Sequence, residues 1–227
     1  MISHNHKCIF IHIPKCAGSS IESALGHFDG HHGRGGQDHR SIRTIEKPVL
    51  TICTFSSKEN IKEYLRRVKY YNYKKVANKK NKTTVTKEQY EKYFKFAVVR
   101  NPWDRAFSWY KNVMRDKIHK KNQGITSDLT FNQFLKVNIG KGMLRPQTYW
   151  LKNYKGLIPL DYIGKFETLQ DTFTKIKERL NLPEIEFPHK KKGSGEDYRS
   201  MYDEESIAHV KNIYHEDIQL FGYTFRS

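Results

Sequence analysis

The sequence lacks cysteine pairs, long apolar runs and a recognisable leader. Three cysteines, Cys8, Cys16 and Cys53, form no CxxC pair, which argues against a disulfide framework or a zinc knuckle. No window holds the roughly 18 apolar residues of a membrane-spanning helix. Met1–Lys7 is polar, and the apolar run Cys8–Ile13 is too short for a signal peptide. We therefore expect no transmembrane segment and a cytoplasmic location.

Acidic residues are also scarce, because 24 Asp and Glu stand against 41 Lys and Arg, for a net charge of +17. Such a charge predicts an anionic partner, and a nucleotide, an anionic glycan, a nucleic acid and an acidic lipid surface all fit it. The length of 227 residues is typical of one domain, expected here over residues 1–227. A lysine-rich insertion is expected at about residues 56–91.

Two segments change from strand-like to helix-like composition within a few residues. Lys7–Ile13 is β-branched and aromatic and precedes a helical pattern at Ser19–Leu25. Phe94–Val99 is a second buried-strand run, followed by helical apolar spacing over Trp103–Met114. Two such switches predict an α/β fold with a parallel sheet.

The remaining segments follow the same criteria. Val49–Phe55 is expected to be a buried strand, Lys58–Tyr73 a basic amphipathic helix, and Lys74–Lys87 a surface loop. We further expect helices at Leu129–Val137, Glu167–Leu180 and Glu204–Leu220, a strand at Tyr162–Phe166, a loop at Pro188–Glu196, and a tail packed through Tyr223 and Phe225.

The turn after the first strand has the composition of an anion-binding loop. It reads Pro14, Lys15, Cys16, Ala17, Gly18, Ser19, Ser20. Small residues let the backbone close on an anion, the following helix start offers N–H groups, and Lys15 adds a charge. The loop is not a Walker A motif, because its lysine precedes the glycine. An ordinary turn with Ser19 as helix N-cap explains the loop equally well.

The second candidate segment follows the second strand. Arg100 stands just beyond Val99, where ligands of open α/β sheets bind, and Ser108 lies two turns into the next helix. An arginine fork and a hydroxyl are suited to a terminal phosphate. Asp104 and Arg105 are expected to serve the helix start and the scaffold. Local pairing of Arg100 is the alternative.

Together the two segments, IFIHIPKCAGSSI and FKFAVVRNPWDRAFSWY, are more specific than either alone. They resemble the paired donor-binding signatures of sulfotransferases that use 3′-phosphoadenosine 5′-phosphosulfate (PAPS), in particular the carbohydrate-type family of heparan 2-O- and chondroitin sulfotransferases with bacterial relatives. The segments LRPQTYWL, YIGKFETL and DIQLFGYTF also resemble this family, so the similarity spans nearly the whole chain.

The resemblance implies a P-loop-like three-layer fold in which a central parallel sheet is flanked by helices. It implies that the 5′-phosphosulfate is held by Lys15 and by Cys16, Ala17, Gly18, Ser19 and Ser20. Lys15 would also be catalytic, by neutralising charge on the leaving oxygen. Arg100 and Ser108 match the pair that grips the 3′-phosphate, and 3′-phosphoadenosine 5′-phosphate (PAP) would be the product. The resemblance favours a carbohydrate acceptor, while a lipid-linked sugar, a small metabolite or a peptide tyrosine could also present the nucleophile. It implies neither a metal nor a nucleic-acid partner.

The family commonly takes the acceptor proton with a histidine or glutamate after the first helix. His39 matches the position at which related bacterial sequences carry a histidine, so we expect it to be the general base, with Glu22 in reserve. A solvent-exposed loop histidine is the alternative, and His27, His31 and His32 lie nearby. These histidines have no partners at metal-ligand spacing, so no metal site is expected.

Two other functions compete with this interpretation. A basic module that binds nucleic acid or an anionic surface fits the charge and the Tyr/Lys mixture of Tyr64–Lys75. An ATP-dependent kinase fits the phosphate-type loop, but not its lysine position. The run Lys190–Gly195 is either a loop that closes the donor site or solvated surface.

Overall fold

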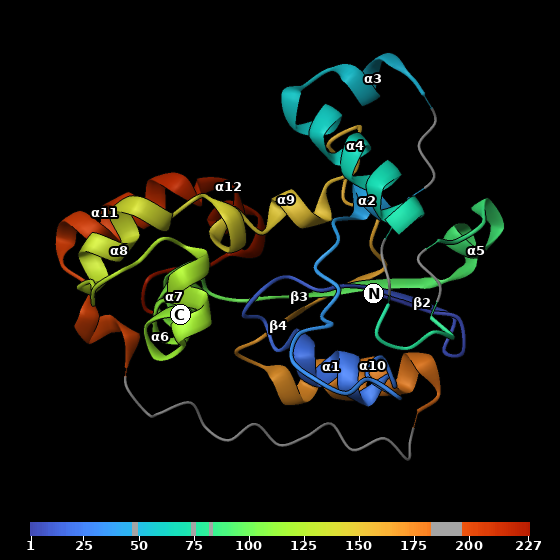
Figure 1. The fold of residues 1–227 in the computed structure, drawn as a ribbon, viewed down its shortest axis with the longest axis horizontal. Helices are drawn as coiled ribbons and strands as arrows, with labels where there is room; N and C mark the ends of the chain where they lie inside the picture. Colours follow the sequence, from blue (N-terminus) through green and yellow to red (C-terminus); the bar gives the residue numbers. More distant parts are fainter. Residues whose placement is uncertain (47–49, 74–75, 82–83, 183–196) are drawn as a thin grey trace. The chain divides into compact units, whose positions relative to one another are not determined.

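The computed structural model describes residues 1–46, 50–73, 76–81, 84–182 and 197–227 (Figure 1). The chain divides into two compact units, each built from two separate stretches. Unit 1 comprises Met1–Val99 and Tyr149–His189, and unit 2 comprises Arg100–Thr148 and Lys190–Ser227. The expectation of one domain over residues 1–227, with an insertion at about 56–91, stays a prediction.

Unit 1 contains a four-stranded sheet in the order β1-β2-β3-β4. The strands are β1 (Ile2–Ser3), β2 (Cys8–Ile11), β3 (Phe94–Val99) and β4 (Tyr162–Lys165). β1 runs antiparallel to β2, whereas β2 with β3 and β3 with β4 are parallel. The side chains of β2 are all buried, as in central strands covered on both faces. The predicted α/β fold with a mostly parallel sheet is confirmed, and so are the three predicted strands that belong to it.

The helices of unit 1 flank this sheet. They are α1 (Gly18–Ala24), α2 (Ile42–Ile45), α3 (Ile52–Phe55), α4 (Lys58–Tyr73), α5 (Lys87–Lys92) and α10 (Leu169–Leu180). In Figure 1, α1 and α10 lie on one side of the sheet, and α2 lies on the other side with α4 beyond it. The short helix α9 (Thr148–Leu151) spans the point in the sequence where unit 1 resumes. Along the described chain, no helix combines the length and apolar character needed to cross a bilayer.

Unit 2 consists of helices around an aromatic core. They are α6 (Pro102–Arg115), α7 (Lys117–Asn122), α8 (Phe131–Asn138), the 3-10 helices η1 (Gly142–Leu144) and η2 (Tyr198–Met201), α11 (Glu204–Ile213) and α12 (His215–Phe221). The buried face of α6 packs Trp103 and Phe107 against side chains of α8 and α11. The tail packs as predicted, because Tyr223 is buried and the ring of Phe225 lies edge-on to Trp103.

Two predicted elements are wrong. Val49–Phe55 was expected to be a buried strand, but its described part forms the short helix α3, and Ile52 is 91% exposed. A short apolar run does not distinguish strand from helix, and here Thr51 and Thr54 form a capping box that starts a helix. Glu204–Leu220 was expected to be one helix, but it breaks between α11 and α12 at Tyr214.

Tyr214 explains that break by a tertiary contact. Its side chain is fully buried, and its hydroxyl donates a hydrogen bond to the backbone oxygen of Leu144. Of the other expectations, the helices at Lys58–Tyr73, Leu129–Val137 and Glu167–Leu180 are confirmed to within two residues at each end. Residues 76–81 and 84–86, within the expected loop, contain neither helix nor strand. The loop expected at Pro188–Glu196 lies outside the described residues.

Strand β4 and helix α10 approach each other closely at a glycine, so Gly164→Ala should destabilise unit 1. A Cβ at position 164 would lie 2.2 Å from Cγ2 of Thr172 and 2.7 Å from its Oγ1. Such overpacking costs about 1–3 kcal/mol, which urea unfolding would measure. Adding Thr172→Ala removes both atoms and should recover part of the loss. Wild-type stability in the single variant would contradict this account of the packing.

Candidate active site

The turn between β2 and α1 has an unusual backbone. Lys15 and Ala17 adopt the left-handed conformation, with φ of 69° and 61°, although neither is glycine. Ala17 is the N-cap of α1 and provides no capping side chain, so Ser19 is not the cap. A left-handed residue followed by a helical one turns successive N–H groups toward the same side, a geometry suited to anions. The loop therefore stores backbone strain at the position where the family resemblance implies phosphosulfate binding.

The ring of His12, the residue directly after β2, packs against this loop at Gly18. His12 is buried, and a Cβ built on Gly18 would lie 1.9 Å from its Cδ2 and 2.2 Å from its Nε2. Only glycine at position 18 lets the helix start pass so close to the imidazole. Gly18 is thus required because the imidazole of His12 leaves no room for a side chain at this position.

Glu22 on α1 fixes the other edge of the His12 ring. One carboxylate oxygen lies 3.1 Å from Nδ1 of His12, and the other accepts a hydrogen bond from the backbone N–H of Asp38 at 3.0 Å. Burial alone would raise the pKa of Glu22, but the charge and hydrogen bond of His12 outweigh it and hold the pKa below its usual value. Glu22 is fully buried and engaged in this way. Its position favours a supporting role over the reserve role of general base.

His39 lies against His12, within the same unit as the loop. Nδ1 of His39 is 3.1 Å from the backbone oxygen of His12, and the two ring centroids are 4.1 Å apart. Because a carbonyl oxygen only accepts, Nδ1 carries the proton and Nε2 presents its lone pair. Burial, reinforced by the charge of His12, lowers the pKa of His39 to about 3. Its neighbour Arg40 is buried and forks onto Asp38, with Nη2 to Oδ2 at 2.7 Å.

The other nearby histidines lie differently. His27 is buried, with Nε2 at 3.0 Å from the backbone oxygen of Gly36, and burial lowers its pKa. The ring of His31 packs near Phe28, and His32 is exposed. Of these four histidines, His39 is thus the one whose ring packs against His12 beside the loop.

Arg100 and Ser108 belong to unit 2, where Arg100 precedes α6 and Ser108 lies within it. The guanidinium of Arg100 forks onto the carboxylate of Asp104, with Nε and Nη2 each 2.7 Å from an oxygen. Asp104 and Ser108 are four residues apart on α6 and therefore lie on the same face of that helix. The alternative in which Arg100 pairs locally is therefore observed, and a phosphate at this face would share Arg100 with Asp104.

The backbone of Arg100 is held by residues that the sequence analysis did not single out. The side-chain amide of Gln147 accepts from Arg100 N at 2.8 Å and donates to Arg100 O at 2.9 Å. Asp217 accepts in turn from the backbone N–H groups of Gln147 and Thr148, at 2.6 and 3.0 Å. Arg105 is buried and bonds backbone oxygens, which confirms its predicted role in the scaffold.

His12 was also missed, although the sequence contains a signal for it. The run CIFIHI is apolar except for one histidine, and a polar residue inside a buried strand pattern needs a partner or a function. His12 belongs with His39 and the loop Lys15–Ser20, all of which unit 1 brings together. Glu22 was considered as a base, but its contact with His12 was not foreseen.

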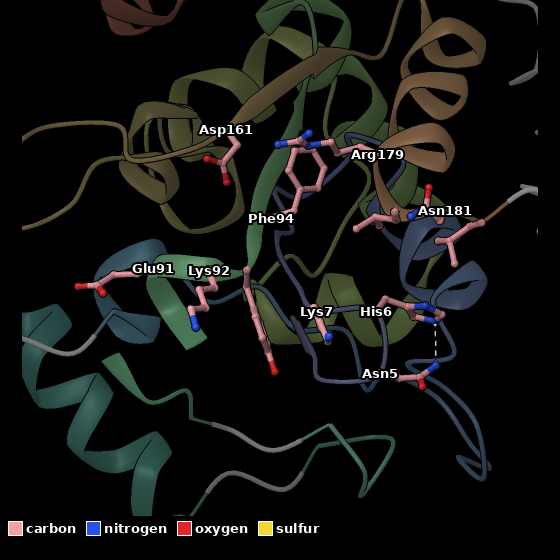
Figure 2. A pocket seen from close by; sticks show the side chains of 12 residues that line it. Asn5, His6, Lys7, Glu91, Lys92, Phe94, Asp161, Arg179 and Asn181 are labelled. Carbon is pink, nitrogen blue, oxygen red and sulfur yellow. Dashed lines mark hydrogen bonds between the residues drawn. The ribbon is translucent and has the colours of Figure 1, made fainter. Parts of the chain in front are cut away.

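A pocket of about 640 Å³ lies elsewhere in unit 1 (Figure 2). It lies at the N-terminal ends of the parallel strands β2 and β3, and its walls include Lys7, Phe94, Asp161 and Arg179. The predicted loop lies beyond the opposite ends of these strands, and no predicted site residue lines this pocket. We therefore place the candidate site at the loop.

A sequence profile described as the sulfotransferase family matches residues 1–224. The chain belongs to this family. It is 32% identical over 102 residues to an uncharacterized protein of Archaeoglobus fulgidus, covering 44% of this chain and 78% of that protein. It is 27% identical over 121 residues to carbohydrate sulfotransferase 14 of Danio rerio, covering 43% of this chain and 33% of that protein. The match thus spans about a third of the zebrafish protein. No solved structure matches the chain.

The depressed pKa of His39 predicts a loss of stability in acid. Neutral His39 stabilises the folded state fully above its unfolded pKa of 6.5, and this contribution is lost as the pH falls from 6.5 toward about 3. His39→Gln removes this dependence. Between pH 7.5 and 5, urea unfolding should show the wild type losing about 1–2 kcal/mol more than the variant. His32→Gln, at an exposed position, should behave as the wild type does. If the free energy of unfolding depended on pH equally in the wild type and in His39→Gln, the lowered pKa assigned to His39 would be wrong.

Proposed function

We propose that the chain transfers the sulfuryl group of PAPS to a hydroxyl of a carbohydrate. The observation that carries this proposal is the family match over residues 1–224, because it contains the strained, uncapped loop after β2. The similarity to the zebrafish carbohydrate sulfotransferase supports a carbohydrate acceptor. The family signatures in the sequence support PAPS as donor.

In this proposal, the loop takes the phosphosulfate end of the donor. Cys16, Ala17 and Gly18 contribute backbone N–H groups, and Ser19 and Ser20 contribute hydroxyls. Lys15 is partly exposed, and its ammonium neutralises the charge that develops on the oxygen leaving with PAP. The strain at Lys15 and Ala17 holds these donors in place before the donor arrives, which avoids an ordering cost on binding.

Recognition of the 3′-phosphate is assigned to Arg100 and Ser108. The ion pair with Asp104 orients the guanidinium of Arg100, and a terminal phosphate offers that guanidinium a stronger, doubly charged partner. Asp104, which holds the guanidinium of Arg100, shares one face of α6 with Ser108, so one phosphate contacts Arg100 and Ser108 in this proposal.

Transfer requires a group to accept the acceptor proton. The acceptor oxygen bonds to sulfur, the bond from sulfur to the bridging phosphate oxygen breaks, and the hydroxyl proton passes to Nε2 of His39. His12 and Glu22 act through His39 and the loop. Glu22 holds the His12 ring at 3.1 Å, and the His12 carbonyl fixes the tautomer of His39. We regard His12 and Glu22 as positioning residues.

Nucleotide binding tests the donor assignment. PAP should bind much more tightly than AMP, because only PAP carries the 3′-phosphate. Arg100→Ala should weaken PAP binding by about 2–3 kcal/mol, the scale of a lost charge-assisted contact, as calorimetry with EDTA would measure. Asp104→Asn is the matched control: it removes the competing carboxylate, so PAP affinity should be kept or increased. Equal affinities for PAP and AMP would overturn the donor assignment.

Steady-state kinetics tests the base. His39→Ala should lower kcat by about 10²–10⁴-fold and leave PAP affinity unchanged. The anionic donor should raise the pKa of His39 from its low value in the free enzyme. The acid inflection of kcat should therefore lie at higher pH than that of kcat/KM for the donor. Full turnover in His39→Ala, with chemistry limiting, would exclude His39.

A further inference from the structure

Helix α4 packs on the rest of unit 1 through its polar face. Glu63 is 2% exposed and accepts hydrogen bonds from Ser41 and Tyr149. Asn60 is also buried and donates to the backbone oxygens of Cys53 and Tyr154 at 2.8 and 3.0 Å. These bonds fix the rotation of α4 about its axis, so the opposite face of the helix has to point outward.

That outer face is apolar. Ile61, Leu65 and Val68 repeat at helical spacing and are all exposed, Leu65 to 61%. Phe55 of α3 extends the surface, because its exposed ring lies edge-on to Tyr64 of α4, with centroids 6.0 Å apart. Residues 50–71 contain seven of the fourteen exposed large apolar side chains among the described residues. An apolar group this concentrated marks an interaction surface. We call Phe55, Ile61, Leu65 and Val68 the α4 outer face.

A row of positive charge runs beside the α4 outer face. Lys58, Lys62 and Lys69 are exposed and share one side of the helix, next to Leu65. In the described part of the chain, no carboxylate forms an ion pair with any of these lysines. Both acidic residues of α4 are engaged elsewhere, Glu59 with Arg43 and Glu63 in the buried network. The outward side of α4 therefore presents aliphatic side chains and lysines together.

We propose that the α4 outer face docks on an anionic lipid surface, with the helix axis in the plane of the interface. Aliphatic side chains beside a lysine row suit such a surface, since the apolar groups enter the acyl boundary and the ammonium groups meet anionic headgroups. This surface is separate from the residues assigned to sulfuryl transfer, so the proposal goes beyond the proposed function.

The same features argue against two other occupants. A second copy docking through the same face about a two-fold axis would bring the lysine rows of both copies together, and like charges across an interface are repulsive. A nucleic acid would be recognised by aromatic stacking and by cations, and it would leave Ile61, Leu65 and Val68 in water.

Vesicle sedimentation tests the proposal on the full chain. The wild type should bind vesicles of phosphatidylcholine with phosphatidylserine at least tenfold more tightly than vesicles of phosphatidylcholine alone. Leu65→Ser with Val68→Ser keeps every charge and should lower binding to the anionic vesicles at least tenfold. Leu157→Ser is the matched control, because Leu157 is 62% exposed in the same unit, and it should leave binding unchanged.

A second set of variants separates the lysine row from total charge. Lys58→Gln, Lys62→Gln and Lys69→Gln together should weaken vesicle binding more than the same loss of charge at Lys79, Lys80 and Lys155, which are also exposed. Circular dichroism and thermal unfolding check that each variant folds. Absence of vesicle binding by the wild type, or equal binding by the Leu65→Ser, Val68→Ser variant, would overturn the proposal.

Self-association is the remaining outcome. Sedimentation velocity that shows a wild-type dimer abolished by Leu65→Ser with Val68→Ser, without vesicle binding, would overturn the lipid assignment in favour of a second copy. PAP affinity should be unchanged in all of these variants, so failure here is distinguishable from failure of the donor assignment.

Discussion

The candidate site depends on one buried imidazole at the end of β2. His12 must be held by a carboxylate, because a polar ring inside a core is destabilising without a partner. Glu22 on the following helix provides it, and this contact brings α1 so near the ring that position 18 can carry no side chain. The backbone carbonyl of His12 also accepts a hydrogen bond from Nδ1 of His39. Loop shape, helix position and histidine tautomer are thereby linked through His12.

Unit 2 fixes its own candidate residue in a different way. Arg100 has a paired side chain and a clamped backbone, and both arrangements are local to this unit. The clamp uses neutral amide bonds, whereas the side chain faces a carboxylate. A ligand can therefore compete for the guanidinium without disturbing the peptide that carries it. Arg100 thus combines a backbone fixed by Gln147 with a side chain that can change its partner.

The local sequence pattern was sufficient to predict an element where its own residues show which side chains are buried. Phe94–Val99 and Lys58–Tyr73 were predicted with their observed bounds, because a continuous apolar run or a helical period persists along the whole segment. It failed at Ile52, whose apolar side chain is left exposed, and at Tyr214, where a distant carbonyl breaks a helix.

Some residues of the candidate site could likewise be predicted from the sequence, whereas others depend on tertiary contacts. Its loop and Arg100 were predicted from residue types and family resemblance. The roles of His12, Glu22 and Gln147 depend on contacts that no spacing specifies. The rotation of α4 belongs with these, because its polar partners at Ser41 and Tyr149 are far away in the sequence.

The contact between Asp217 and the backbone of Gln147 has a consequence for the order of folding during synthesis. The four strands of the described sheet lie within the first 165 residues, whereas Asp217 comes later in the sequence. Domains generally fold as units while the chain is still emerging. The sheet can therefore form on the ribosome while the peptide at residue 147 still lacks its acceptor. Unit 2 acquires its final geometry only when α12 has left the exit tunnel.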